Sequence, residues 1–578
     1  MGDRNQHHKG SGATIGGVDF YRRRKRGLLC SSVLRSIAES VSSTREAVLT
    51  RAPRASEQVR VEARLWCILA ITVFVLAVLR RAWACDDAFI SLRVAKNLIS
   101  GQGFVFNVGE RVLGITNPLW TLLLTLPAAL SLNPYLSLVL MGVVVSALAA
   151  SVFVYGVARD PRCGAIVLVL LCFSRAFVDF STSGLENSLT HLLLFAFYAL
   201  LLQSDGRALA SLTFVTALAS INRLDSLPLF LPALAQALFV GRRKLEPRHL
   251  LAALPALAWF GFCLVYFGFL LPNTSYAKLN VEIARSELCR QGFSYLFDTL
   301  FADPLTALII GAALSLSLLR ARRDALARAV AISLAIDLGY VVGVGGDFMT
   351  GRFLTGATAL SGVALLAFAE RALPRASDLR PAALALAALS TSFTFSPFRQ
   401  ERDVEKGDMP SNRIVNERAW YQENLLLWTN FRPETWKQKG WYVEGAEAKK
   451  SGARVVVKSN IGLFSWAAGS GVHVVDTFAL TEPLLARVPF AYDSEWRTGH
   501  LERPLPNGYV KSLEEARNFI EDACLAAYYD RLDTVIHGPL FRRARWANIL
   551  FLNGRSGRTV RACPGQPRAK PLGNALVR

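Results

Sequence analysis

Apolar stretches of membrane-spanning length recur between residues 65 and 393, separated by short polar loops. A helix needs about 20 apolar residues to cross the hydrocarbon core of a bilayer. Some stretches are shorter, so their ends are set only to within a few residues. The pattern predicts a polytopic α-helical membrane protein with eleven spans, at residues 65–84, 135–158, 165–180, 188–202, 208–221, 227–240, 250–271, 304–319, 325–344, 353–369 and 382–393.

One further apolar stretch, residues 117–132, decides the orientation of the loops. If it does not cross, the arginine-rich loops all lie on the cytoplasmic side, as the positive-inside rule requires. If it crosses, every later loop inverts and the rule fails. We therefore expect a helix that lies at the outer interface or re-enters the membrane. Arg80 and Arg81, at the outer end of the first span, are exceptions to the rule.

Hydropathy divides the chain into three parts. Residues 1–63 are polar and basic and predict a disordered cytoplasmic tail. Residues 64–396 form a transmembrane domain with a first outer loop at 85–134. Residues 397–578 form a C-terminal domain, which eleven spans place outside the cytoplasm. Helical segments at 416–428 and 513–529, and strands at 454–458 and 472–475 joined by glycine-rich turns, indicate that this domain has an α/β fold.

The composition supports a membrane protein and weakens other classes. Of the 578 residues, 52% are hydrophobic, and the mean hydropathy is +0.31, which is too apolar for an ordinary soluble protein. The 65 Lys and Arg against 44 Asp and Glu give a net charge of +21. Cytoplasmic loops account for this excess, and no nucleic-acid motif accompanies it, so no nucleic-acid partner is expected. The nine cysteines lack zinc spacing, and Cys524 and Cys563 are as well placed to pair outside the cytoplasm as to remain free.

The predicted orientation brings the unusual polar segments to one face. Ionisable groups at membrane depth usually line a cavity or a site. Five such segments fall at outer loops, so we expect an active site at the outer leaflet. They are Asp86-Asp87, residues 183–186 (SGLE), 222–225 (NRLD), 271–278 (LPNTSYAK) and 345–352 (GGDFMTGR).

The first outer loop carries a nearly continuous motif, DDAFISLRVAKNLISGQGFVFNVGERVLGITNPLW, at residues 86–120. This stretch resembles the first outer loop of the GT-C glycosyltransferases that use polyprenyl-phosphate sugars. Within that superfamily it is most similar to the terminal arabinofuranosyltransferases of mycobacterial arabinan and their bacterial relatives. The resemblance continues in SGLE, LPNTSYAK and GGDFMTGR, in residues 460–487, and in RTGHLERP at 497–504. At 222–225 the chain reads NRLD, where relatives usually read TRPD.

The resemblance implies sugar transfer from a polyprenyl-phosphate donor, most simply arabinofuranose, to a hydroxyl of a cell-envelope glycan, with inversion. The C-terminal domain would guide that acceptor glycan. A carboxylate can accept the hydroxyl proton, and two adjacent carboxylates raise each other's pKa. The resemblance assigns the base to Asp86 and acceptor binding or orientation to Asp87. The alternative is that both carboxylates cap the helix that follows; the two roles are compatible.

Cationic residues on the same face suit the leaving phosphate, because Arg and Lys bind phosphate oxygens. The predicted phosphate-binding residues are Arg223, Lys278, Arg352 and Arg93. Structural ion pairs, Arg223 with Asp225 and Arg352 with Asp347, are the alternative. A capping role is likewise the alternative for Glu186. The resemblance predicts substrate contacts from Glu186, Asp225, Asn273, Tyr276, Asp347 and His500.

The sequence indicates no metal or cofactor. It has no three-His or His-plus-carboxylate cluster with metal spacing and no phosphate-binding glycine loop. A divalent cation is therefore possible but not indicated, and a nucleotide-sugar donor is not expected. Two rivals stay open. The same fold can use another lipid-linked sugar, such as mannose or aminoarabinose. A transporter or flippase for a lipid-linked saccharide would also use membrane carboxylates and cations, although the inverted repeats typical of transporters are not evident.

Overall fold

The computed structural model describes residues 57–203, 208–240, 246–279, 281, 283–372, 410–421, 425–427, 435–490, 492–494, 496–554 and 560. The chain divides into two compact units, Met1–Ala63 and Arg64–Arg578. Most of the first unit lies outside the described residues, as do the predicted span at 382–393 and Cys563. Every site residue predicted from the sequence belongs to the second unit.

Several described helices are long and apolar enough to cross a bilayer. One pair of helices, α13 (Arg285–Ala302) and α14 (Pro304–Arg320), is bent by 113° at the break between them and offers one further candidate span. The length and composition of these helices are those of a polytopic membrane protein. The predicted number of eleven spans stays a prediction. By length and composition, the five single candidates are Val61–Arg80 in α2 (Glu57–Arg80), Pro134–Val157 (α5, Pro134–Val152, with η1, Phe153–Val157), Pro247–Phe267 (α11, Pro247–Phe262, with η3, Cys263–Phe267), Ala325–Gly343 (α15) and Arg352–Ala372 (η4, Arg352–Leu354, with α16, Thr355–Ala372).

Other apolar helices are too short to cross alone. The helix α4 (Pro118–Ala129) occupies the stretch whose topology decided the orientation. Its 12 residues rise only about 18 Å at 1.5 Å each, well short of the hydrocarbon core. The helix α4 alone is therefore too short for a straight crossing, and the interfacial or re-entrant placement of residues 117–132 stays a prediction. The remaining membrane-part elements are α6 (Pro161–Leu171), α7 (Arg175–Asp179), α8 (Asn187–Gln203), α9 (Leu209–Asn222), η2 (Leu224–Leu229) and α10 (Leu231–Val240).

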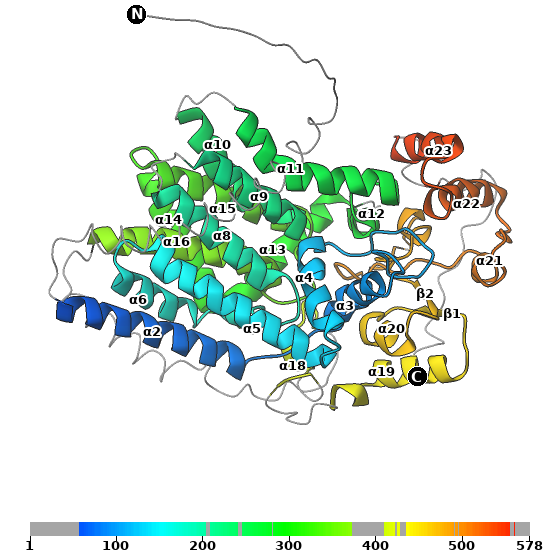
Figure 1. Cartoon of the computed structure of the whole chain (residues 1–578), viewed down its shortest axis with the longest axis horizontal. Helices are drawn as coiled ribbons and strands as arrows, with labels where there is room; N and C mark the ends of the chain where they lie inside the picture. The colour runs from blue at the N-terminus through cyan, green and yellow to red at the C-terminus, as the bar shows by residue number, and fades with distance from the viewer. Residues whose placement is uncertain are drawn as a thin grey trace, which may run out of the picture. The chain divides into compact units, whose positions relative to one another are not determined.

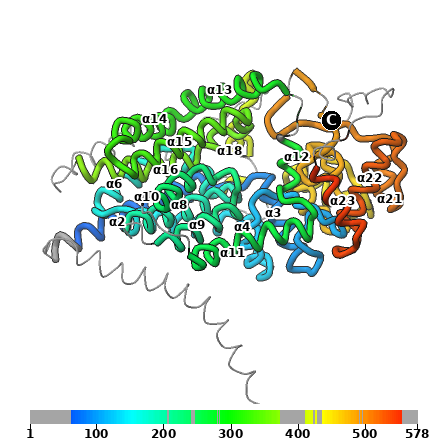
Figure 2. The backbone as a smooth tube through the Cα atoms, turned by 90° about the horizontal axis from the view of Figure 1, so that it is seen from above, coloured from blue at the N-terminus to red at the C-terminus, as the bar shows by residue number. Residues whose placement is uncertain are grey.

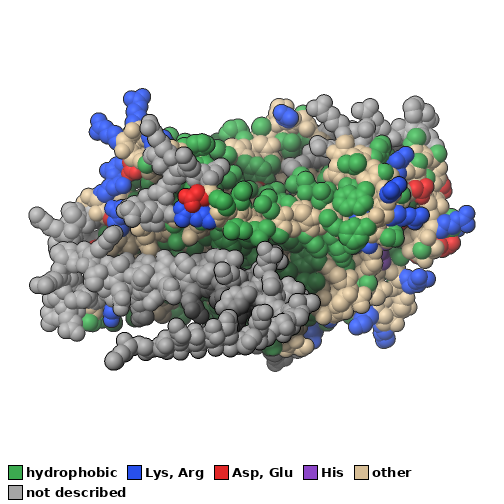
Figure 3. Space-filling view, turned by 45° about the horizontal axis from the view of Figure 1, so that its top comes forward, with side chains coloured by type: hydrophobic (Ala, Val, Ile, Leu, Met, Phe, Trp, Pro, Cys, Tyr) green, Lys and Arg blue, Asp and Glu red, His purple; other side chains and the backbone are tan. Residues whose placement is uncertain are grey.

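Small residues allow the helices to approach closely. A Cβ on Gly142 of α5 would lie 2.6 Å from the Ser181 carbonyl oxygen, and one on Gly362 of α16 would lie 2.8 Å from a Leu171 methyl carbon of α6. Helix association in lipid depends on such close packing, because lipid supplies no hydrophobic drive between helices. Hydrophobic side chains cover the middle of the described surface in Figure 3, with most Lys and Arg to either side, as a bilayer requires.

The C-terminal part contains a βαβ unit. The strands β1 (Val455–Lys458) and β2 (His473–Asp476) pair in parallel, with Val455 opposite His473. The two predicted strands are thus confirmed to within a residue. The predicted glycine-rich turn between them is wrong in part, because parallel strands need a crossover and α20 (Gly462–Ala468) supplies it.

The two helices predicted at residues 416–428 and 513–529 have different bounds in the structure. The first is confined to α18 (Glu417–Trp420) within the described residues. The second is wrong as one helix, because Ala516 takes a left-handed φ of 51° and separates α21 (Tyr509–Glu515) from α22 (Ala523–Ile536). The remaining C-terminal elements are η6 (Thr435–Gln438), α19 (Gly440–Lys450), η7 (Leu485–Arg487) and α23 (Arg543–Asn553).

The C-terminal part packs on the membrane part within one compact unit. Single backbone bridges join Trp83 to Leu426 and Met349 to Val415. In Figures 1 and 2, α3 (Asp86–Ile99), α4 and α12 (Asn273–Leu279) lie between the membrane helices and the C-terminal elements. A domain boundary at residue 397 stays a prediction. Cys524 is disulfide-bonded, which suits an oxidising compartment.

Candidate active site

The five polar segments predicted to share a face meet where the membrane and C-terminal parts join. The Ser183 carbonyl accepts the backbone N–H of Cys85 at 2.9 Å, which holds the 183–186 segment against the start of α3. The Arg352 guanidinium lies 3.9 Å from Asp87 and 4.0 Å from Glu186. Segments separated by up to 266 positions, from Asp86 to Arg352, thus supply one charged cluster.

The first carboxylate, Asp86, is bound to the C-terminal part. Its Oδ2 and Oδ1 accept the backbone N–H groups of Gly462 at 2.9 Å and Leu463 at 2.7 Å, at the start of α20. A Cβ on Gly462 would lie 1.9 Å from the Asp86 carbonyl oxygen, so only glycine permits this contact. Burial raises the pKa of Asp86 to about 6, although the two N–H groups oppose the rise. Asp86 therefore caps α20, in addition to standing in the first turn of α3.

The second carboxylate, Asp87, faces the cations. Its side chain is 33% exposed, and Oδ2 lies 3.9 Å from Arg352 Nη1. Burial raises the pKa of Asp87, and the positive charges of Arg352 and Lys278 oppose that rise. Of the two carboxylates, Asp87 is the more open to a substrate.

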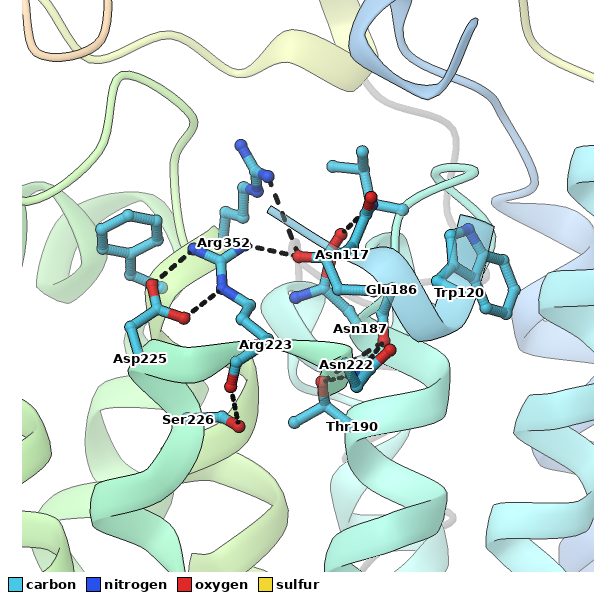
Figure 4. Close-up of polar contacts among 12 residues, drawn as sticks. Asn117, Trp120, Glu186, Asn187, Thr190, Asn222, Arg223, Asp225, Ser226 and Arg352 are labelled. Atoms are coloured by element: carbon cyan, nitrogen blue, oxygen red, sulfur yellow. Dashed lines mark hydrogen bonds and ion pairs between the residues drawn. The ribbon is translucent and has the colours of Figure 1, made fainter. Parts of the chain in front are cut away.

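Glu186 is a fully buried anion at the base of the cluster. Its Oε2 accepts Asn117 Nδ2–H at 2.7 Å, and its Oε1 accepts an N–H of Arg223 (Figure 4). Burial favours the neutral acid, but Arg223 and Arg352 outweigh it and lower the pKa of Glu186 to about 2. Gly184 lies in the turn before Glu186 and has a φ of 81°, which favours glycine. A Cβ on Gly184 would also lie only 2.6 Å from the Cβ of Ala88.

Arg223 is fully engaged by protein carboxylates. Its Nε and Nη2 donate to the two oxygens of Asp225 at 2.6 and 2.8 Å, and its third nitrogen donates to Glu186 (Figure 4). The structural pair with Asp225, foreseen as the alternative, is present. Arg223 thus orders the cluster, and any phosphate would compete with Asp225 or Glu186 for it.

Arg352 is less fully engaged. Its Nη1 lies 3.5 Å from Asp347 Oδ2, which is the second pair foreseen as an alternative. Its Nε, however, is buried and has no hydrogen-bond partner. Positive-φ residues Gly345, Gly346 and Gly351 shape the loop that presents it. Arg352 therefore keeps a donor that a bound anion can satisfy.

Lys278 approaches the same cluster from α12. No carboxylate oxygen of the described residues lies within 4.0 Å of its amine. Burial lowers the pKa of Lys278, while the carboxylates of Asp347 and Asp87 favour its charged form. His500 lies nearby, edge-on to the ring of Phe348 at 4.2 Å. Burial and adjacent positive charge lower the pKa of His500 well below its usual value, so it is neutral.

Three predicted site residues contact other parts of the protein. Arg93 donates its Nε, Nη1 and Nη2 to the carbonyls of Phe106, Ser465 and Val472. Asn273 donates to the carbonyls of Ala479 and Glu482 and accepts from Arg487. Tyr276 lies with its ring over Arg487. The described contacts of these three are thus internal, away from the charged cluster.

Two residues of the cluster had no assigned role in the sequence. Asn117 stands in the motif ITNPLW but had no predicted partner, and it binds Glu186. Burial, and to a lesser extent the negative charges of Asp87 and Asp347, raise the pKa of Glu417 of α18 well above its usual value. Its Oε2 is buried without a partner. The local sequence NERAW gives no signal for this, because only the tertiary fold brings α18 to the site.

The described residues contain no group of three His, Cys, Asp or Glu side chains that could hold a metal ion. Independence from metal ions remains a prediction.

Paired carboxylates can accept a proton, and the partly unsatisfied cations beside them can bind a phosphate group. The chain is similar to two arabinofuranosyltransferases. It is 29% identical over 323 residues to the terminal β-(1→2)-arabinofuranosyltransferase of Corynebacterium glutamicum, covering 47% of this chain and 46% of that protein. It is 29% identical over 329 residues to the enzyme of the same name from Mycobacterium tuberculosis, covering 48% and 51%.

The chain spans about half the length of the curated relatives it matches. No family model and no solved structure matches it. The similarity is thus to arabinofuranosyltransferases, over part of each chain.

Proposed function

We propose that this chain is a membrane glycosyltransferase that moves a sugar from a polyprenyl-phosphate donor to a hydroxyl of a cell-envelope glycan. Arabinofuranose is the sugar that the two relatives' names favour. The reaction would take place at the outer face of a bacterial cytoplasmic membrane, where lipid-linked donor and envelope glycan are both accessible.

One observation carries the proposal: the cluster contains cationic donors that the protein does not satisfy. Arg352 Nε is buried without a partner, and the Lys278 amine has no carboxylate within 4.0 Å among the described residues. Burying such donors unpaired costs free energy. A phosphate bound between them would recover that cost, and it would do so beside Asp87, where an acceptor hydroxyl can reach a carboxylate.

The reaction would be a displacement at the anomeric carbon. The acceptor oxygen forms a bond to C1 as the bond from C1 to the phosphate oxygen breaks, and that electron pair leaves with polyprenyl phosphate. The acceptor proton passes to a carboxylate. Arg352 and Lys278 stabilise the negative charge that grows on the phosphate. A single displacement inverts C1, so NMR of the product's anomeric configuration tests this step.

The Asp86–Asp87 pair would supply the base. Asp86 is the base that the family resemblance implies. Each of its oxygens accepts one backbone N–H and keeps a second lone pair for a proton. Asp87, the more open of the two, would bind the acceptor hydroxyl and orient it. Glu186 and Arg223 would hold Arg352 in place.

Reconstituted full-length protein tests the proposal. Radiolabelled polyprenyl-phosphate arabinofuranose and an oligoarabinoside acceptor should yield a longer glycan with wild-type protein and none with Asp86→Asn. Lys511→Gln, at an exposed lysine on α21, is the matched control and should retain turnover. Donor binding that persists in Asp86→Asn would separate lost chemistry from lost binding. Movement of the lipid-linked sugar across vesicles without acceptor, unaffected by Asp86→Asn, would favour a transporter and contradict the proposal.

A further inference from the structure

A small hollow that opens to the surface contains none of the charged residues of the candidate active site. Its wall is mostly apolar, with Phe267, Phe269 and Leu271 on one side. Two guanidinium groups, those of Arg111 and Arg487, also line it. Two positive charges in an apolar hollow require explanation, because burying a charge without a counter-charge is costly.

Arg487 is buried, with 2% exposure, and all its described partners are uncharged. Its Nη1 donates to Asn273 Oδ1 at 3.1 Å and to the Pro483 carbonyl at 2.7 Å. The rings of Phe269 and Tyr276 lie 4.3 and 4.5 Å from its guanidinium carbon. Its Nε is buried and has no hydrogen-bond partner. The charge is held in position, but one donor remains unsatisfied.

Arg111 has the same character at the other side of the cavity. It donates to the carbonyls of Val535 and Gly538, and its Nε is also buried without a partner. Among the described residues, no carboxylate lies within 4.0 Å of either guanidinium. Two positively charged residues, each with one unpartnered N–H, therefore line the hollow.

Three other buried arginines, all outside the charged cluster, pair every nitrogen of the guanidinium group with the protein. Arg93, Arg503 and Arg545 each donate Nε, Nη1 and Nη2 to backbone carbonyls. Those three connect distant segments of chain, and each nitrogen of their guanidinium groups has a partner in the protein. Arg111 and Arg487 differ because the Nε of each has no partner. Hydrogen bonds that join backbone segments therefore do not fully explain the position of these two arginines.

The position of the cavity indicates the source of the anion. It lies at the end of the candidate span Pro247–Phe267, only 11% of which is buried inside the protein, so α11 faces lipid. Phe267 ends that span and lines the cavity, and Leu271, which is 39% exposed, stands at its edge. A span's end lies at the level of the lipid headgroups.

We propose that Arg111 and Arg487 form a second phosphate site, which takes the headgroup phosphate of a membrane lipid whose acyl chains lie along α11. Guanidinium donors match phosphate oxygens, and the apolar wall suits the glycerol and upper acyl carbons. The site is independent of the proposed sugar transfer. It would anchor the junction of α11, α12 and α22 to the bilayer.

Lipid retention and thermal unfolding test the proposal on the full chain in detergent. Wild-type protein should retain phosphatidylglycerol in native mass spectrometry, and added phosphatidylglycerol should raise its unfolding temperature. Arg111→Gln and Arg487→Gln should each weaken that binding at least tenfold. Arg531→Gln, which removes an exposed positive charge from α22, is the matched control and should bind as wild type does.

Two results would overturn the proposal. Equal retention of phosphatidylglycerol by wild type, Arg111→Gln and Arg487→Gln would show that the lipid binds elsewhere. Inorganic phosphate that stabilises wild type as strongly as the lipid does would make this a site for free anions. Should Arg487→Gln fail to fold, Arg111→Gln carries the test, because Arg111 is only partly buried.

Discussion

The carboxylate of Asp86 accepts the backbone N–H of Gly462 at 2.9 Å, across 376 positions of sequence. The bond joins the first residue of α3, in the membrane part, to the first residue of α20, in the C-terminal part. Backbone N–H groups at a helix start stabilise an anion. The C-terminal part is therefore a structural component of the candidate active site and holds the proposed base in one position.

Replacing Gly462 with alanine should abolish sugar transfer. The new Cβ would lie 1.9 Å from the Asp86 carbonyl oxygen, so α20 must move away and release the carboxylate. We expect transfer to fall at least about 100-fold, the order typical of losing a positioned catalytic group. Gly471→Ala, where a Cβ meets nothing within 4 Å, is the control. Full activity in Gly462→Ala would argue against positioning of Asp86 by α20.

The rate of transfer should fall in acid with a midpoint near pH 6. Burial raises the pKa of Asp86 to about 6, and only its ionised form accepts a proton. Below that pH the rate constant kcat/KM should drop about tenfold per pH unit. Glu186, with its pKa lowered to about 2, stays ionised throughout this range and adds no second step. A profile flat from pH 7 to pH 4.5 would exclude Asp86 as the base.

The same raised pKa of Asp86 has a consequence for stability. The folded state favours protonated Asp86, so ionisation costs folding free energy once the pH rises above the unfolded pKa, near 4, and fully above about 6. Asp86→Asn removes that cost but keeps no base. Wild type should therefore gain stability relative to Asp86→Asn as the pH falls from 7 to 4, as followed by thermal unfolding in detergent.

Lys278→Met should separate activity from stability. The Lys278 side chain is partly buried, with no carboxylate within 4.0 Å of its amine among the described residues, so removing it relieves a desolvation cost, and the unfolding temperature should stay the same or rise. Transfer should nevertheless fall about 100-fold, because a positive charge that stabilises the leaving phosphate is lost. Lys511→Met is the exposed control. A large fall in stability with little change in turnover would assign Lys278 a structural role.

Arg223→Gln should act in the opposite way, chiefly on stability. It leaves the buried carboxylate of Glu186 without its main cation, and breaking a buried pair from one side costs about 3–5 kcal/mol. The unfolding temperature of Arg223→Gln should drop clearly, and Glu186→Gln should drop it too. The double variant should lose less than the sum of the two, since neither partner is left charged and alone. Additive losses would mean that the pair is not coupled.

Chelation should leave transfer intact. The proposed phosphate site uses Arg352 and Lys278, and the described residues hold no three-ligand cluster for a metal. Protein treated with EDTA and assayed without divalent ions should keep its turnover. Loss of activity that added Mg²⁺ or Mn²⁺ restores would show that an ion bridges the donor phosphate, and the phosphate assignment would need revision.

Sequence patterns predicted much of the local structure, because they depend on local physics. The length of an apolar stretch determines whether its helix can cross the bilayer. The three consecutive valines of RVVVK, which are β-branched and favour strands, predicted β1. The same patterns failed at residues 459–471, where a helix replaces a turn, and at Ala516, where a helix breaks. Those outcomes depend on a parallel crossover and on packing between distant segments, which no short window of sequence contains.

For the site, the sequence by itself determined the chemical groups. It also predicts the face on which they gather, because hydrophobic length and positive loop charge limit where ionisable residues can lie. Only the tertiary structure decided how those groups are used. In the folded chain each nitrogen of Arg93 donates to a backbone carbonyl, and Asn273 accepts a hydrogen bond from Arg487. Arg352 Nε has no hydrogen-bond partner. Hydrogen bonding is short-ranged and saturable, so a donor's availability depends on its neighbours in space.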